Sequence, residues 1–111
     1  MSVGLRDQLI RIYAYTDVGV DGLMASAYEY VETQWGRIEP PSAREETHGE
    51  KAGFKVEGVV TLGWEAAVEE KSIIAVENQY WHVHAVLPRR GVYEKQLYVS
   101  RVLDDVVVVT S

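Results

Sequence analysis

The segment from residue 54 to residue 64 alternates its two faces more regularly than any other part of the chain. One set of alternate positions is apolar or small, namely Phe54, Val56, Gly58, Val60, Leu62 and Trp64. Because successive side chains of a strand point to opposite faces, this period of two predicts a β-strand with one buried side. No segment sustains a helical period over the length that helices need, so we expect an all-β fold.

Other segments rich in β-branched and aromatic residues also predict strands, at residues 8–16, 27–39, 72–76, 80–88 and 95–103. Loops or tight turns separate them, including a Gly- and Asp-rich loop at 17–22. About six antiparallel strands of this kind form a small barrel or sandwich, because closure removes exposed edges. We expect one domain over residues 1–111, with a C-terminal extension at 104–111.

Two segments have a less regular pattern of apolar and polar residues than the strands above. In the strand at 27–39 the alternation slips between Trp35 and Ile38, and Gly36 lies between them. A glycine at such a slip predicts a β-bulge or bend at Gly36. Residues 65–71 fit either one helical turn or an irregular connection.

Residues 40–53, PPSAREETHGEKAG, show no periodicity and contain no large apolar residue. The two prolines end the preceding strand, since neither can donate to a β-ladder. Structureless loops longer than about 12 residues are uncommon unless they are functional or disordered. We therefore predict a long flexible loop between the second and third strands, and the other interpretation is a tolerated surface insertion. Its candidate functional residues are Pro40, Pro41, Ser42, Arg44, Glu45, Glu46, His48, Glu50 and Lys51.

Composition excludes several classes of function. Seventeen acidic against eleven basic residues give a net charge of −6, which argues against tight binding of nucleic acid but leaves loose contact open. The absence of cysteine excludes disulfides, thiolate metal sites and cysteine nucleophiles. The N-terminus lacks the apolar core of a signal peptide, and no run approaches the roughly 18 apolar residues of a membrane span. We expect action in a cytoplasm or export by another route, without a membrane.

The best candidate for chemistry is a pair of histidines. His82 and His84 share one face of a strand and could bind a metal with His48 or a glutamate as a third ligand. The alternative is a solvated or interfacial strand face opposite Trp81 and Val83, which we favour because no ligand cluster accompanies the pair. No serine or carboxylate pair stands in a catalytic context. We predict no enzymatic activity and no cofactor.

Aromatic residues indicate contacts with other proteins. The chain has seven tyrosines and three tryptophans against one phenylalanine, and Tyr and Trp are enriched at interfaces. Val59 and Val86 place further apolar side chains on the second face of their strands. We predict a subunit or partner interface, and the alternative is a small barrel with many half-buried tyrosines. The candidates are Tyr13, Tyr15, Tyr28, Tyr30, Tyr80, Tyr93 and Tyr98.

The order of these features is similar to that of a known family. A Trp-containing strand runs into the pattern I-x-P-x-S-x-x-E, here Ile38, Pro40, Ser42 and Glu45, and a strand pair between residues 74 and 86 follows the polar loop. Over roughly residues 5–103 the chain resembles the head–tail joining proteins of long-tailed bacteriophages, also called head completion or head–tail connector proteins. The resemblance leaves open whether this is a stopper, an adaptor or a tail-side component.

The resemblance implies a virion structural protein. It implies a homo-oligomeric ring, a dodecamer in the virion, with a portal or adaptor protein on the head side and a tail protein on the other. Genome DNA would pass through its channel without sequence-specific binding, and the loop at 40–53 would line or gate that channel. The location would be the head–tail interface, after assembly in the host cytoplasm. The alternative function is a monomeric small barrel that binds another protein or single-stranded nucleic acid through exposed aromatics.

Overall fold

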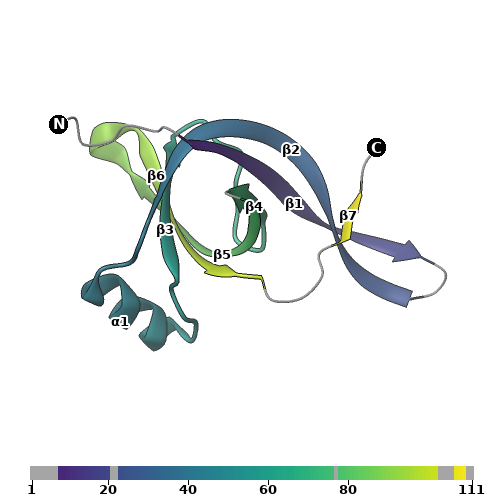
Figure 1. Cartoon of the computed structure of the whole chain (residues 1–111), viewed down its shortest axis with the longest axis horizontal. Coiled ribbons are helices and arrows are strands. Elements are labelled where there is room, and N and C mark those ends of the chain that lie inside the picture. Colours follow the sequence, from purple (N-terminus) through teal and green to yellow (C-terminus); the bar gives the residue numbers. More distant parts are fainter. Residues whose placement is uncertain (1–7, 21–22, 77, 103–106, 110–111) are drawn as a thin grey trace.

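The computed structural model describes residues 8–20, 23–76, 78–102 and 107–109 (Figure 1). These residues form a β-barrel with one short α-helix on its outside. The elements are β1 (Gln8–Val20), β2 (Leu23–Glu39), α1 (Ala43–Ala52), β3 (Gly58–Gly63), β4 (Ile73–Val76), β5 (Gln79–Arg89), the 3-10 helix η1 (Arg90–Val92), β6 (Glu94–Arg101) and β7 (Val107–Val109). Within the described residues, no helix combines the length and the hydropathy of a membrane span.

The sheet closes on itself. The strands follow the order β1-β4-β5-β6-β3-β2, and β2 pairs back with β1. All of these pairings are antiparallel. β7 lies outside the closed barrel, where it pairs in parallel with β2. The prediction of an all-β barrel of about six antiparallel strands is therefore confirmed.

Alternate side chains of β1, β3, β4, β5 and β6 fill the interior, and Ile38 of β2 packs against them half-buried. This core contains Ile10, Ile12, Val60, Leu62, Ala66, Val68, Ile74, Val76, Trp81, Val83, Leu97 and Val99. The period of two predicted for residues 54–64 holds only within β3, which begins at Gly58, where Val60 and Leu62 face the interior; Trp64 is exposed. Phe54 and Val56 precede the strand and pack with Val59 outside the barrel. The remaining strand predictions agree with β4, β5 and β6 to within a few residues.

Gly36 faces the crowded interior at the closure of the barrel. It pairs with Gln8 of β1 on one side and with Leu62 of β3 on the other. A Cβ atom at this position would lie 2.6 Å from Leu62 Cδ2 and 2.9 Å from the carbonyl oxygen of Thr61, and it would also overlap Ile10 Cδ1. The predicted bulge at Gly36 is wrong, because the pleat is regular there and the glycine provides space instead.

The irregularity lies five residues earlier in the strand. Ile12 is opposite Glu32, but the next residue, Tyr13, is opposite Tyr30, so Val31 is the extra residue of the bulge. An extra residue exchanges the two faces of the strand beyond it. The apolar residues on either side of Val31 can therefore share one face although their numbers differ in parity.

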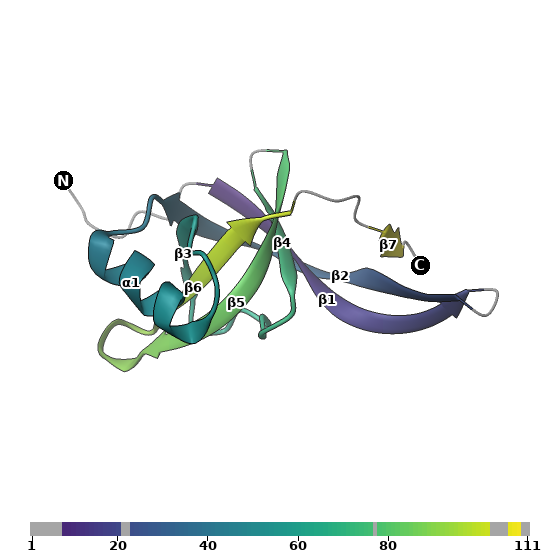
Figure 2. The same ribbon diagram turned by 90° about the horizontal axis from the view of Figure 1, so that it is seen from below.

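β1 and β2 continue together beyond the barrel. β4 pairs with β1 only at Arg11–Tyr13, and β3 pairs with β2 only at Gly36–Glu39, whereas β1 and β2 pair as far as Val20 and Leu23. The result is a two-stranded ribbon that projects away from the barrel (Figures 1 and 2). The loop predicted at 17–22 is wrong for residues 17–20, which are strand, and residues 21 and 22 lie outside the described part.

The other expected irregular segments are confirmed in part. Residues 65–71 contain turns and no helix, so the connection is the irregular one of the two alternatives. In the C-terminal extension at 104–111, Val107–Val109 form β7. Residues 104–106, 110 and 111 lie outside the described residues.

Candidate functional site

The segment predicted as a flexible loop contains helix α1, so that prediction is wrong. A capping box starts the helix. The Glu45 N–H donates to Ser42 Oγ at 3.2 Å, and the Ser42 N–H donates to the Glu45 carboxylate at 2.8 Å. Each bond satisfies a donor that the first turn of a helix leaves free. Glu46 in the first turn and Lys51 in the last turn also complement the helix dipole.

A left-handed glycine ends the helix. Gly53 has φ 94°, a conformation that glycine adopts without steric cost. Its N–H donates to the Glu50 carbonyl at 3.2 Å, and the Phe54 N–H donates to the Gly49 carbonyl at 2.9 Å. The last carbonyls of α1 therefore have partners, and the chain turns back toward β3.

The C-terminal half of α1 contacts the outside of the barrel. Gly49 is buried, and a Cβ there would lie 2.5 Å from Val56 Cγ2. The His48 ring meets the Tyr98 ring edge-on, with 5.5 Å between centroids. Val59 and Tyr98 are buried in this cluster, so the chain itself covers the apolar second face of β3. Burial, followed by the nearby Glu45 carboxylate, raises the pKa of Tyr98.

The rest of α1 faces outward. Of the loop candidates, Pro41 and Glu45 are half-buried. The exposed ones are Pro40, Ser42, Arg44, Glu46, His48, Glu50 and Lys51. Helix α1, which carries most of these residues, lies at the end of the molecule opposite the tip of the ribbon (Figure 1).

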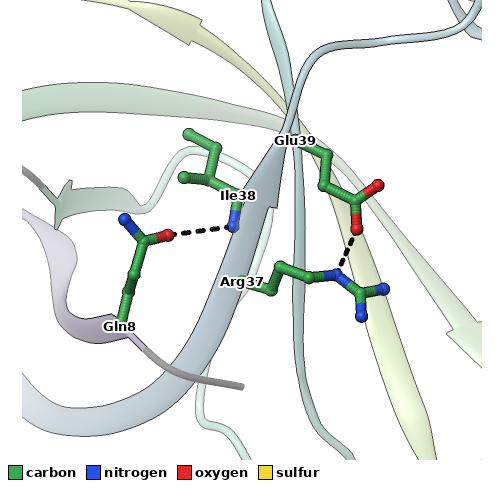
Figure 3. A network of polar contacts seen from close by, with 4 residues as sticks. All are labelled: Gln8, Arg37, Ile38 and Glu39. Carbon is green, nitrogen blue, oxygen red and sulfur yellow. Dashed lines mark hydrogen bonds and ion pairs between the residues drawn. The ribbon is translucent and has the colours of Figure 1, made fainter. Parts of the chain in front are cut away.

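Polar contacts stabilise the end of β2, just before the chain enters α1. The side-chain oxygen of Gln8, at the start of β1, accepts a hydrogen bond of 3.3 Å from the Ile38 N–H near the end of β2 (Figure 3). In the same view Arg37 forms an ion pair with Glu39, two residues along the strand. The bond from Gln8 adds to the β1–β2 pairing at the point where the chain leaves for α1.

Four of the candidate tyrosines form two cross-strand pairs on one face of β1 and β2. Tyr13 is opposite Tyr30, and their rings meet edge-on at 5.8 Å. Tyr15 is opposite Tyr28, with a similar contact at 5.7 Å. Tyr80 of β5 extends the group, since its ring lies 5.9 Å from that of Tyr13. Edge-to-face pairs of this kind stabilise a sheet beyond the area that they bury.

Exposure differs within this group. Tyr15 and Tyr30 are 40% and 50% exposed, whereas Tyr13 and Tyr28 are buried. Burial raises the pKa of Tyr13 and of Tyr28, because the phenolate would lose hydration. The phenol of Tyr30 is hydrogen-bonded to Thr33 Oγ1 at 2.7 Å.

Two further residues of the same face are not among the candidates predicted from the sequence. Leu9 and Trp35 lie directly opposite each other and are 55% and 56% exposed. The bulge at Val31 brings Trp35 to the same outward face as Tyr30, although the two positions differ in parity. The burial of Ile10 and Ile12 indicates that Leu9 points outward. We name the set Leu9, Tyr13, Tyr15, Tyr28, Tyr30 and Trp35 the β1–β2 outer face.

The last two candidate tyrosines lie elsewhere. Tyr98 is buried beside α1, as described above. Tyr93 follows η1 in the turn between β5 and β6, where it has φ 52° and is 75% exposed. The seven tyrosines therefore do not form one surface.

His82 and His84 line an open hollow of about 620 Å³ together with Tyr15, Tyr28, Glu70, Lys71 and Val83. The two imidazole centroids are 6.3 Å apart, and His84 Nε2 is hydrogen-bonded to Ser100 Oγ at 2.6 Å. Phe54 stacks on the His84 ring at 4.7 Å. Burial, followed by the neighbouring His82, lowers the pKa of His84.

The histidine pair does not gain a third ligand from His48, which contacts Tyr98 instead. Over the residues that the structure describes, no three His, Cys, Asp or Glu side chains gather in a metal-binding group. The hollow therefore brings together side chains that could bind a small polar molecule, without the arrangement of a metal centre.

No family model matches the chain, and no curated protein matches it in sequence. Its structure is similar to the solution structure of protein SF1141 from Shigella flexneri 2a, with a TM-score of 0.75. The two sequences are 13% identical, and the match covers 95% of this chain and 100% of SF1141. At this identity the likeness concerns the fold alone.

Proposed function

We propose that this chain is a non-enzymatic head–tail connector protein of a long-tailed bacteriophage, which assembles into a ring that extends the portal channel. The sequence resemblance over roughly residues 5–103 suggests the family. The closed barrel is compatible with it. The β1–β2 outer face is the observation that carries the proposal, because exposed aromatic side chains on one face are what packing against other subunits would require.

The chain covers Tyr13 and Tyr28 of the β1–β2 outer face but leaves its other four members exposed. Leu9, Tyr15, Tyr30 and Trp35 each expose two fifths or more of their surface on neighbouring, paired strands. Arg11 and Thr33 lie on the same face between the Leu9–Trp35 pair and the tyrosines, so the exposed apolar side chains form two neighbouring groups. Exposed apolar groups that gather on one face of a soluble protein favour association with a partner. Aromatic residues also contribute more to interfaces than most side chains, because they bury a large area with few rotatable bonds. A ring of identical subunits would cover this face.

Helix α1 suits the channel of such a ring better than a flexible loop does. Its outward surface is polar and carries Arg44 and Lys51 against Glu45, Glu46 and Glu50. Mixed charge creates only a weak field toward DNA, and the net charge of −6 disfavours tight binding of a polyanion. In the proposed ring, α1 faces the lumen and the passing genome.

Electron microscopy tests the assembly. We would co-express the chain with the portal protein of the same phage genome and examine the purified particles for rings attached to the portal. The variant Tyr30→Ser/Trp35→Ser is expected to abolish the rings, while Trp64→Ser, an exposed tryptophan outside the β1–β2 outer face, keeps them. Tyr30→Ser also removes the ring contact with Tyr13, which costs about 0.5–1.5 kcal/mol, so circular dichroism is used to verify that both variants are folded before their rings are compared. A chain that stays monomeric beside the portal protein would contradict the proposal.

A binding assay with single-stranded nucleic acid distinguishes the proposed ring protein from the alternative, a monomeric binding module. Fluorescence anisotropy with a labelled oligonucleotide is expected to show no binding at low salt. Salt-sensitive binding that is lost in Tyr93→Ala, combined with the absence of rings, would favour a monomeric binding module instead.

A further inference from the structure

Strand β7 is an addition to a barrel that is already complete. The six barrel strands close through the β1–β2 pairing without it. β7 pairs with β2 alone, with Val107, Val108 and Val109 opposite Ala27, Tyr28 and Glu29. Residues 27–29 of β2 lie in the ribbon, beyond the residues at which β1 pairs with β4 and β2 pairs with β3 (Figures 1 and 2). The barrel therefore does not need β7 from its own chain.

The segment that leads from the barrel to β7, here called the C-terminal arm, begins at Val102, which is hydrogen-bonded to β5. The Val102 N–H donates to the Tyr80 carbonyl at 3.0 Å, and the Gln79 side-chain amide donates to the Val102 carbonyl at 3.3 Å. Residues 103–106 separate this point from β7 in the sequence. The arm thus begins at the rim of β5 and β6 and ends on a different part of the molecule, the β1–β2 ribbon.

The pairing is weak within one chain but suited to an exchange between chains. A parallel ladder of three residues is short, and parallel pairing is slightly less stable per residue than antiparallel pairing. Valine is among the residues that favour strands, so the run keeps its preference for an extended partner. A strand that moves to a second copy makes the same hydrogen bonds there, so exchange costs little free energy.

We propose that in the assembled ring β7 of each subunit pairs with β2 of its neighbour, so that the C-terminal strands link the subunits in a closed chain of exchanges. This inference rests on the proposed ring. It assigns the free edge of β2 at Ala27–Glu29 as the acceptor and a second copy of this chain as its partner. The exchange also extends the interface beyond the β1–β2 outer face.

Engineered cysteines test the exchange directly, because the natural chain contains no cysteine. Glu29 and Val109 are opposite each other in the ladder, and Glu29 is exposed. Paired strands lie about 4.8 Å apart, within the range of Cα distances that a disulfide spans. The double variant Glu29→Cys/Val109→Cys would be oxidised as the free chain and as rings on the portal protein, then run on a denaturing gel without reductant. Thr33→Cys/Val109→Cys is the matched control, since Thr33 is an exposed residue of β2 outside the β7 ladder.

The expected result is an internal disulfide in the free chain and a ladder of covalent oligomers from the rings, with neither product in the control. Rings that give only the internal disulfide overturn the exchange while the proposed function stands. A ladder from the control equal to that of the test pair also overturns it, because the contacts would then be unspecific. A chain that forms no ring with the portal protein overturns both the exchange and the proposed function.

Discussion

Gly36 shows at the scale of one residue why the barrel closes where it does. The Gly36→Ala variant is expected to lower the free energy of unfolding by about 1–3 kcal/mol, because overpacking displaces neighbours in a tight core. One of those neighbours is the Thr61 carbonyl, which belongs to backbone and cannot rotate away. Urea unfolding followed by tryptophan fluorescence measures the change.

Gly91 provides the control for this substitution. It lies in η1, and a Cβ there would meet no atom within 4 Å. Gly91→Ala should change the free energy of unfolding by about 0.5 kcal/mol or less. Equal losses in the two variants would show that crowding at Gly36 is not the cause.

His84 makes the stability depend on pH. Its pKa in the folded chain is lowered from the ordinary value of 6.5, so the unfolded chain binds a proton at higher pH than the folded chain does. The free energy of unfolding is therefore expected to fall as the pH drops below about 6.5, until the folded form is also protonated, and this contribution is constant above about pH 7.5. Protonation would also change the ring that Phe54 stacks on and the hydrogen bond to Ser100.

Two histidine variants separate this effect from general acid sensitivity. Urea midpoints at pH 7.5 and pH 5.5 should differ less in His84→Gln than in the natural chain. His48→Gln leaves His84 in place on β5 and should retain the natural difference. An unchanged difference in His84→Gln would exclude His84 as the source.

At the scale of the element, helix α1 depends on its caps. It buries only Gly49 among its own residues, so packing contributes little and the terminal hydrogen bonds matter more. Ser42→Ala removes the acceptor for the Glu45 N–H and should cost about 1 kcal/mol of helix stability. Hydrogen exchange of the amides at 45–52 should accelerate by about fivefold, which is that free energy expressed as a rate ratio.

Thr47→Ala is the control within the same helix. The Thr47 hydroxyl bonds to the Ala43 carbonyl, a contact that competes with the helix ladder and adds little to it. Exchange of the same amides should stay close to the natural rate. A Ser42→Ala helix that is as well protected as the Thr47→Ala helix would contradict the role of the capping box.

The same element shows what the sequence could and could not predict. The strands follow from alternation, because the barrel interior selects one apolar face in each of them. Helix α1 has no apolar period to detect, since nearly all of its surface faces solvent. Its signals are local ones, the S-x-x-E box at Ser42 and Glu45 and the terminal Gly53, and the loop prediction gave them no weight.

The candidate surfaces were predictable only in part, for a related reason. Val59 looked like an interface residue because it is apolar on the second face of its strand, but α1 and the residues after it cover that face. The place of Trp35 on the same face as Tyr30 was not predicted, because the bulge was assigned to Gly36 and not to Val31. Both errors arise from tertiary contacts that alternation along one strand does not contain.

At the scale of the whole molecule, closure of the sheet into a barrel determines the fold more than the identity of individual residues does. The fold resembles that of SF1141 at 13% identity, so very different side chains can build the same closed sheet. Alternation and turn spacing were enough to predict about six antiparallel strands in a barrel or sandwich, and the β1–β2 pairing in the structure decides for the barrel. The ribbon was not predictable in this way, because the Gly and Asp residues at 17–22 resemble a loop and only the pairing with β2 extends β1 to Val20.

The ribbon leads to a prediction for the free and the assembled protein. Residues 58–63 of β3 all pair with β6, and residues 59–62 also pair with β2, whereas residues 14–20 of β1 pair with β2 alone. Apart from the three-residue ladder with β7, the ribbon has two strands, and a two-stranded ribbon is marginally stable in water. In the free chain the amides at 14–20 should therefore exchange faster than those at 58–63. Assembly on the portal protein should slow exchange at 14–20 and leave 58–63 unchanged, because the proposed ring covers the ribbon and not the interior of the barrel. Hydrogen exchange with mass spectrometry measures both segments in one experiment. Equal protection of the two segments in the free chain would show that the ribbon is stable without neighbours, and the physical reason for expecting subunits around it would be lost.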